Sequence, residues 1–600
     1  MLFNSYIFIF IFLPLCLMGF YILQNRQATL AKVWLTCFSL WFYGYFNRSY
    51  LLIMVCSIIG NYFIHCLIVK VRNIELAKEW SEDSKNVNSR RFREKGEESR
   101  AKKFEVLKQY AWAKKSKIIL ITGVILNLLI LFYFKYFDFF IDNVNSLFGS
   151  SIPLKNILLP LGISFFTFQQ ISFLVDTYRG ELNQYSDTLL ENNAKTAAKE
   201  RVALSVEERK GERSIGFIDY ALFVSFFPQL IAGPIVVHEE MIPQFARIGK
   251  DTRSKEEKVE IFTKGVYVFV LGLAKKVLIA DTFGIAVDLA YSNVDAINGF
   301  ESLITILFYS LQLYFDFSGY CDMAKGIAGM FGMSIANNFN SPYKATNIVE
   351  FWKRWHITLS RFFTRNIYIP LGGNRKGEVR MYINYLIVFF LSGLWHGAGW
   401  NFILWGMMHG VLYVVTKWWI VKEKQSTNNG VRKSEYKISN DIKCGTDTVE
   451  ANRPDVHSST VLLWKSRFWK TVGCIFTFIY VSIAWVYFRA SSVEQANTLL
   501  LNIFTKPWAL PGSGFTDAFN LGEFWYILKI LKIAVLPYAK YYIMIIFSAF
   551  TIIITFFGKN MEELAARYKP TIWSAAATAV LFIWCVVSLS GVSTFLYFNF

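Results

Sequence analysis

The sequence has little charge for its length. Asp, Glu, Lys and Arg make up only 18% of the 600 residues, whereas 54% of the residues are hydrophobic and 18% are aromatic. Soluble domains typically carry about 25% charged residues. The shortage of charge therefore argues against a soluble protein and directs attention to where the apolar residues lie.

Motifs for several familiar chemistries are also missing. The eight cysteines form no CxxC pair and show no metal-ligand spacing. The chain has no Gly-x-Ser-x-Gly elbow and no glycine loop that could cradle a phosphate. We therefore expect no metal and no bound cofactor. A covalent serine mechanism and nucleotide hydrolysis have no support from the sequence.

Long apolar runs take the place of charge. They cover residues 6–23, 51–69, 118–134, 217–237, 261–279, 402–415, 468–488, 541–557 and 572–589. A helix needs about 20 apolar residues to cross a bilayer, and lipid cannot satisfy free backbone groups. We predict an all-α polytopic membrane protein with roughly ten to thirteen membrane segments, some of them short or re-entrant.

The net charge of +19 has a simple interpretation in such a protein. On a soluble chain it would suggest nucleic acid, but in membrane proteins Lys and Arg concentrate in cytoplasmic loops. The basic segments 70–117 and 417–470 are therefore predicted to be cytoplasmic and to contact anionic lipid headgroups. We expect membrane lipids as partners and no nucleic acid.

The composition changes along the chain and divides it into regions. We predict N-terminal transmembrane helices at 1–70, a basic cytoplasmic loop at 71–117, a core at 118–420 with a charged insert at 183–214, a polar disordered loop at 421–461, and C-terminal transmembrane helices at 462–600.

Three stretches of the predicted core are unusual. Residues 158–170 contain Ser, Thr and Gln, so that helix should face the protein interior. Residues 217–237 contain Pro228 and Pro234, which predict a broken helix. Residues 309–380 are too polar to cross lipid and too aromatic for a free loop, which favours short amphipathic helices in the interface or around a funnel.

The six histidines differ in their sequence context. An imidazole is costly at membrane depth unless it faces a cavity or a partner, and it can exchange a proton near neutral pH. His396 and His356 lie in Trp-rich apolar sequence and are candidate catalytic residues, with His409 as a possible accessory. Hydrogen bonding between helices is the alternative. We expect packing for His65, a surface or helix-end role for His238, and no role for His457.

A carboxylate could orient a catalytic imidazole, as it does in acyl-transfer triads. Asp316 and Asp322 are the acids available in membrane-like sequence. Asp176 is a third candidate, although a structural pair with Arg179, three residues further on, is the alternative for it.

Several ordered motifs carry a resemblance. They are LPLGISFFTFQQISFLVDTYRGEL (159–182), FVSFFPQLIAGPI (223–235), YFDFSGYCDMAKGIAGMFG (314–332), NFNSPYKATNIVEFWKRWHITLSRFFTRNIYIPLGGNR (338–375) and LSGLWHGAGWNFILWGMMHG (391–410). Together they resemble the membrane-bound O-acyltransferases, in particular the bacterial alginate O-acetyltransferase branch. The ending FLYFNF (595–600) resembles that of the family too, so we expect a complete chain.

The resemblance implies a fold and an activity. The fold would be a helical membrane disc with short interfacial or re-entrant helices around a central funnel. An acyl group, most simply acetyl, would leave a cytosolic thioester and reach a hydroxyl at the outer face of a bacterial inner membrane. The donor would be acetyl-CoA, or a carrier protein as in teichoic-acid D-alanylation. A periplasmic acetyltransferase or a polysaccharide-secretion partner would then place it on the polymer, such as alginate or peptidoglycan.

The resemblance also implies roles for individual residues. The two histidines of the family fall on His396, as general base, and on His356, which would polarise the acyl carbonyl or position the acceptor. Further donor or substrate contacts are expected from Trp395, Asn401, Tyr314, Asp316, Lys353, Arg354 and Arg365. The three basic residues would meet a diphosphate or an acidic carrier, with interfacial snorkelling as the alternative.

Two other classes of function remain open. A transporter of a lipid-linked or acidic substrate would also use buried His and Asp and broken helices, but many transporters have repeated halves and none is visible here. A scaffold for polysaccharide secretion would need no buried histidines.

Overall fold

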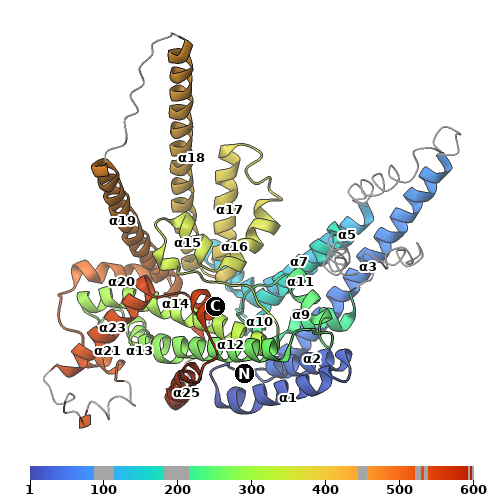
Figure 1. The fold of residues 1–600 in the computed structure, drawn as a ribbon, viewed down its shortest axis with the longest axis horizontal. Coiled ribbons are helices and arrows are strands. Elements are labelled where there is room, and N and C mark those ends of the chain that lie inside the picture. Colours follow the sequence, from blue (N-terminus) through green and yellow to red (C-terminus); the bar gives the residue numbers. More distant parts are fainter. Residues whose placement is uncertain are drawn as a thin grey trace. The chain divides into compact units, whose positions relative to one another are not determined.

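Helices are the only regular elements of the residues that the structure describes, which are 1–86, 114–180, 215–443, 456–520, 529–530, 532, 538–591 and 595–596 (Figure 1). The structure is a computed structural model. The predicted all-α class is confirmed for these residues. Two predicted segments lie outside them: the charged insert at 183–214, and residues 444–455 of the polar loop predicted at 421–461.

The described chain forms two compact units, Met1–Phe269 with Met323–Ala336, and Val270–Asp322 with Asn337–Phe600. The elements of the first unit are η1 (Phe8–Phe12), α1 (Leu13–Gln24), α2 (Ala28–Gly44), α3 (Arg48–Asn86), α5 (Lys114–Leu131), η2 (Phe132–Tyr136), α6 (Phe137–Phe148), α7 (Ile163–Arg179), α9 (Phe217–Ser225), α10 (Phe227–Leu230), α11 (His238–Ala246) and most of α12 (Lys255–Ala274).

The second unit begins in the last turn of α12 and contains the longest helices. Its elements are η5 (Lys275–Ala280), α13 (Asp281–Ser292), most of α14 (Gly299–Met330), η6 (Pro342–Lys344), α15 (Ile348–Arg354), α16 (Ile357–Phe363), η7 (Thr364–Tyr368), α17 (Glu378–His396), α18 (Trp400–Lys443), α19 (Val456–Arg489), α20 (Val493–Thr505), α21 (Ser513–Asp517), α23 (Ala539–Phe557), α24 (Met561–Arg567), α25 (Ile572–Val587) and η9 (Ser588–Gly591).

Four helical segments of the described residues are long and apolar enough to cross a membrane: Arg48–Ile74, Lys115–Phe148, Phe468–Arg489 and Ala539–Phe557. Two shorter apolar segments are Phe8–Gln24 and Ile572–Val587. This is fewer than the ten to thirteen predicted, because other apolar runs lie in helices that are broken, short or interrupted by charge. Several such helices identify a membrane protein.

The first unit confirms two predictions about its interior. Most side chains of α7 are buried, and the Gln170 side chain accepts a hydrogen bond from Ser57 at 2.9 Å. The apolar run 217–237 is broken: α9 ends at Ser225, and the chain is no longer helical at Pro234. Proline cannot continue an undistorted helix, which accounts for the break.

The prediction for residues 309–380 is half right. Short elements do follow one another from η6 to η7, and most side chains of α15 are buried. Residues 309–330, however, belong to the long helix α14, and Tyr314 to Tyr320 are buried along it. The carboxylate of Asp316 is tolerated in the interior because Nζ of Lys276 lies 2.6 Å from it, a partner that the sequence does not reveal.

The loop predicted at 421–461 is largely helical in the structure. Helix α18 continues to Lys443 and α19 begins at Val456. Extending an existing helix avoids the cost of nucleating a new one, so a polar Lys- and Glu-containing segment can prolong an apolar helix. Residues 421–443 and 456–461 are thus helical in the structure, where the sequence predicts a disordered loop.

Helices α17 and α18 form a tight hairpin, side by side in Figure 1. A Cβ at Gly393 would lie 2.5 Å from the backbone oxygen of Phe402, and one at Gly406 would lie 2.5 Å from that of Phe389. Only glycine permits such a close approach. The hairpin fixes the end of α17, where His396 is the last residue.

Candidate active site

His396 is held by the backbone of its own helix. Its side chain is 4% exposed, and its Nδ1 lies 2.6 Å from the carbonyl oxygen of Ser392. A carbonyl oxygen can only accept, so Nδ1 carries the hydrogen and donates it. In the neutral imidazole Nε2 then carries the lone pair, which makes Nε2 the atom able to take a proton.

His356 stands at an unusual point of the backbone. It is the N-cap of α16, it is fully buried, and its φ and ψ of 44° and 53° are left-handed. Its Nδ1 lies 3.3 Å from Oδ1 of Asn338. The same oxygen accepts the backbone N–H of Thr358 at 3.1 Å, which identifies it as the amide oxygen. His356 therefore also donates from Nδ1, and its Nε2 carries the lone pair.

Tryptophan rings join the buried histidines into one cluster. Trp395 packs edge-on against His396, at 4.7 Å between ring centroids, and against His356, at 6.2 Å. Trp405 packs against His396 at 4.8 Å and against His409 at 5.1 Å. Trp395 thus contacts both candidate catalytic imidazoles.

His409 has the opposite hydrogen-bonding pattern. It is fully buried, and its Nδ1 lies 3.4 Å from Nε1 of Trp352. An indole N–H can only donate, so Nδ1 of His409 accepts and its hydrogen is on Nε2. The lone pair that could act as a base is already used. This geometry favours a packing role for His409 over the accessory role predicted for it.

The acids predicted to orient an imidazole are paired with lysines. Asp316 lies 2.6 Å from Nζ of Lys276, which also contacts Asp281 at 2.7 Å. Asp322 lies 2.6 Å from Nζ of Lys275. The orienting oxygens of the two imidazoles are instead a backbone carbonyl and an amide. Because buried carboxylates need a cationic or hydrogen-bonding partner, the neighbouring lysines account for both acids.

A short C-terminal segment packs near the candidate site, which was not predicted from the sequence. The backbone N–H of Leu596 donates to Asp316 at 3.1 Å, and Phe595 stacks on Tyr320 at 4.6 Å. Phe595 also contacts Phe317, whose ring packs edge-on against His356 at 4.9 Å. Nothing in the local sequence of Phe595 indicates a partner almost three hundred residues away.

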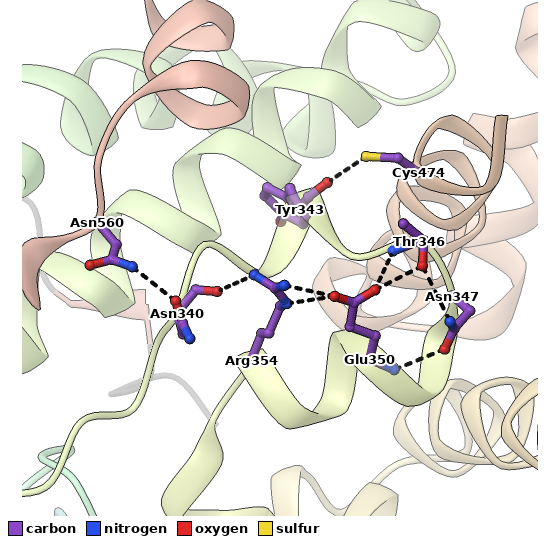
Figure 2. Close-up of polar contacts among 8 residues, drawn as sticks. All are labelled: Asn340, Tyr343, Thr346, Asn347, Glu350, Arg354, Cys474 and Asn560. Atoms are coloured by element: carbon purple, nitrogen blue, oxygen red, sulfur yellow. Dashed lines mark hydrogen bonds and ion pairs between the residues drawn. The ribbon is translucent and has the colours of Figure 1, made fainter. Parts of the chain in front are cut away.

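Arg354, predicted to meet a donor phosphate, is engaged within its own unit (Figure 2). Its Nη2 and Nε lie 2.6 and 3.1 Å from Oε1 of Glu350, and its Nη1 donates to the backbone oxygen of Asn340. The other Glu350 oxygen accepts from the backbone and hydroxyl of Thr346. Burial acts to raise the pKa of Glu350, but these hydrogen bonds and the arginine lower it overall. A phosphate would have to compete with this carboxylate for Arg354.

The other predicted contact residues fall into two groups. Lys353 is exposed and Arg365 is half-buried, so both are accessible to a ligand. Asn401 is buried, and its amide donates to the backbone oxygens of Ala490 and Tyr487 at 2.8 and 3.2 Å. Tyr314 packs among aromatic rings, including Tyr343 at 5.4 Å. The geometry thus gives Asn401 and Tyr314 packing roles.

The first unit buries a second acid and imidazole. Asp176 and His238 are both buried, with 3.3 Å between Oδ2 and Nδ1. His238 begins α11, as predicted for a helix end, but it is not at the surface, and the partner found for Asp176 is this histidine rather than the expected Arg179. Burial followed from the fold: α7 and α11 meet around Phe173, whose ring contacts His238 at 5.6 Å.

Together with Glu239, this pair forms a group of described residues that could hold a metal ion. Ligand atoms of Asp176, His238 and Glu239 lie within 4.8 Å of one another. The group was not predicted from the sequence because Asp176 is distant in the chain from His238 and Glu239. His65, in the same unit, contacts the hydroxyl of Thr177 at 2.9 Å and is buried, which confirms its packing role.

Comparison with known proteins adds an independent line of evidence. The model of the membrane-bound O-acyltransferase family matches residues 144–421, which include all three clustered histidines. A Helicobacter pylori protein named peptidoglycan O-acetyltransferase is 34% identical over 616 residues, covering 100% of this chain and 98% of that protein. A Pseudomonas aeruginosa protein named probable alginate O-acetylase is 31% identical over 504 residues, covering 83% and 73%. Teichoic acid D-alanyltransferase of Bacillus subtilis is 27% identical over 271 residues, covering 43% and 59%.

Proposed function

Since the chain belongs to the membrane-bound O-acyltransferase family and is an O-acyltransferase, we propose that it moves an acetyl group from a cytosolic thioester across the membrane for O-acetylation of peptidoglycan. The observation behind this choice of polymer is the end-to-end match to a peptidoglycan O-acetyltransferase. The relatives named for alginate match a smaller share of the chain. The proposed location is the bacterial inner membrane.

His396 is the general base of the proposed reaction. Its Nδ1 donates to the carbonyl of Ser392, so Nε2 is the acceptor atom. Nε2 takes the proton of the acceptor hydroxyl as the hydroxyl oxygen attacks the thioester carbonyl. When the tetrahedral intermediate collapses, the C–S bond breaks and the proton passes from Nε2 to the departing sulfur. The imidazole is thereby returned to its starting form.

His356 positions the acceptor in this scheme. With Nδ1 donating to Asn338, the neutral His356 ring presents an acceptor at Nε2. It can therefore accept a hydrogen bond from a hydroxyl but cannot donate one from Nε2 to the acyl oxygen. The alternative role, polarising the carbonyl, would require a protonated ring. The geometry favours positioning of the acceptor over polarisation of the donor.

Burial of the two imidazoles suits a thioester reaction. Water competes with an alcohol for a thioester, and a site away from bulk water reduces hydrolysis. A low local dielectric also strengthens hydrogen bonds to the developing oxyanion. We propose acetyl-CoA as the donor, with Lys353 and Arg365 as accessible cations for its diphosphate. A separate extracytoplasmic acetyltransferase is the proposed partner that places the acetyl group on the glycan.

The experiment follows radiolabel from acetyl-CoA into the envelope of cells or membranes that contain the wild-type chain or His396→Ala at matched levels. We expect alkali-labile label in muropeptides with the wild-type chain and its loss with the variant. Label on another glycan would replace peptidoglycan as the polymer. Equal labelling by the variant would remove the role given to His396. Labelling only from a carrier-protein thioester would favour D-alanyl-type transfer.

A further inference from the structure

The side-chain amide of Asn338 holds the turn that carries His356, between α15 and α16, through several hydrogen bonds. Oδ1 of Asn338 receives hydrogen bonds from Nδ1 of His356 at 3.3 Å, from the backbone N–H of Thr358 at 3.1 Å and from the hydroxyl of Thr358 at 2.7 Å. Its Nδ2 donates to Sγ of Cys321 at 3.5 Å. Asn338 is 2% exposed. Three donors on one buried oxygen leave it no freedom to turn.

The backbone around Asn338 fixes the same turn from both sides. Its carbonyl oxygen accepts the N–H of Ile357 at 3.1 Å, just after His356. Two residues on, the N–H of Asn340 donates to the carbonyl of Arg354 at 2.9 Å, just before it. The segment 338–340 is thus bonded to the chain on either side of His356.

These hydrogen bonds on either side of His356 explain how it keeps a left-handed backbone conformation. Such a conformation brings the Cβ too close to the following carbonyl oxygen and is strained for any residue other than glycine. It persists where the surroundings impose it, and such residues concentrate at functional sites. Here the imposed conformation ends α15, begins α16 and turns the imidazole toward Trp395 and Phe317.

Asn338 also selects the tautomer of the imidazole. The backbone N–H of Thr358 requires an acceptor, which orients the amide and leaves the oxygen toward Nδ1 of His356. A neutral imidazole beside an acceptor must donate, so its lone pair is placed on the far nitrogen. An apolar side chain at position 338 would remove this preference and allow the lone pair on either nitrogen.

We infer that Asn338 is a positioning residue for His356, fixing both the tautomer and the orientation of that imidazole toward the acceptor hydroxyl. The inference rests on the proposed function, in which His356 presents Nε2. It assigns no contact between Asn338 and the substrate. A purely structural role would lower the amount of folded protein without changing the turnover of each folded molecule.

The test is a double-mutant cycle in detergent-solubilised, full-length protein, with acetyl-CoA as the probe and turnover normalised to folded protein. The variants are Asn338→Leu, His356→Gln and both together. We expect Asn338→Leu to lower kcat about 10- to 100-fold, as changes to groups that orient a reactive imidazole do, with little change in the KM for acetyl-CoA. Adding Asn338→Leu to His356→Gln should cost less than twofold more, since the group it acts through is already gone.

Two matched controls separate the contacts of Asn338. Thr358→Val removes one donor from the same oxygen and leaves the His356 contact in place, and Cys321→Ala removes the partner of Nδ2. Both should keep kcat within about threefold of wild type. If Asn338→Leu does not accumulate, Asn338→Ser repeats the cycle, because its short hydroxyl is polar but does not reach Nδ1.

The outcomes distinguish this inference from the proposed function. Losses that multiply in the double variant, or unchanged kcat in Asn338→Leu, would overturn the positioning role. An equal loss of kcat in Thr358→Val would show that the effect comes from the turn between α15 and α16 as a whole. That result would also overturn the positioning role of Asn338. Retained labelling in His396→Ala would instead sink the proposed function, whatever the cycle shows.

Discussion

Each unit of the molecule buries a histidine beside an oxygen, but the oxygens differ. In the second unit Nδ1 of His396 meets a backbone carbonyl and Nδ1 of His356 meets an amide. In the first unit Nδ1 of His238 meets the carboxylate of Asp176. A neutral oxygen sets the tautomer of an uncharged ring, whereas a carboxylate can also form an ion pair across two helices. Burial alone therefore does not identify a catalytic histidine; the partner of its second nitrogen is needed.

The largest expected effect comes from removing one imidazole from each unit, His396 or His238, and comparing the two variants. His396→Ala should lower acetyl transfer per folded molecule by at least about 100-fold, because general-base catalysis contributes 10²–10⁴-fold. His238→Ala should leave transfer per folded molecule within about threefold while reducing thermal stability. The measurement is initial-rate acetyl transfer normalised by fluorescence-detected size exclusion. Comparable losses of turnover in both variants would show that the two regions are not functionally distinct.

The next effect concerns the hairpin that carries His396. Gly406→Ala places a Cβ where it would lie 2.5 Å from the backbone oxygen of Phe389, so α17 and α18 must separate. Overpacking of this kind typically costs about 1–3 kcal/mol. We expect a lower thermal midpoint and a reduced kcat. Gly60→Ala is the control, since no atom of the described residues lies within 4 Å of the Cβ position there. A Gly406→Ala protein as stable and active as the control would contradict the close approach of the two helices.

The comparison also shows what the sequence can predict. The helical class, the buried α7, the broken run at 217–237 and the family follow from local patterns: apolar runs, prolines and contiguous motifs. The site does not follow so directly. His356 and His396 were chosen as candidates because each lies in an unusual aromatic motif, but their partners Asn338 and Ser392 look like any polar residue in a loop or helix.

Long-range pairing is where sequence reasoning failed. The sequence suggested Asp316 and Asp322 as partners of the imidazoles. In the structure they form ion pairs with Lys276 and Lys275, which belong to η5. The sequence suggested Arg179 for Asp176, and the fold supplies His238. In each case the partner lies on another helix and is brought close by helix packing, which no local pattern encodes.

A smaller effect would sharpen the assignment of the first unit. Asp176→Asn keeps the size of the side chain but removes its charge, and altering one partner of a buried polar pair costs about 1–3 kcal/mol. We expect a lower thermal midpoint with turnover per folded molecule unchanged. Incubation with a chelator, followed by metal analysis of the purified protein, tests the group formed with Glu239 separately. A stoichiometric metal that disappears in Asp176→Asn would change its assignment from a structural pair to a metal site.

The smallest expected effect is a pH dependence at the Glu350–Arg354 pair in Figure 2. Hydrogen bonds from Thr346 and the nearby arginine hold the pKa of Glu350 below its ordinary 4.5, although burial acts in the opposite direction. A carboxyl whose pKa is lowered by folding adds stability above its unfolded pKa, and that stability is lost as the pH falls through the folded pKa. The stability advantage of wild type over Glu350→Gln should therefore be present at pH 7 and shrink as the pH falls below about 4.5. Thermal midpoints at pH 7 and below about pH 4.5 measure it, with Glu378→Gln as a control whose carboxylate accepts an exposed hydrogen bond from Gln425 at 3.1 Å. An advantage that stays constant down to low pH would mean that Arg354 is not held by the charge of Glu350, and Arg354 would then be as available to a donor phosphate as the sequence suggested.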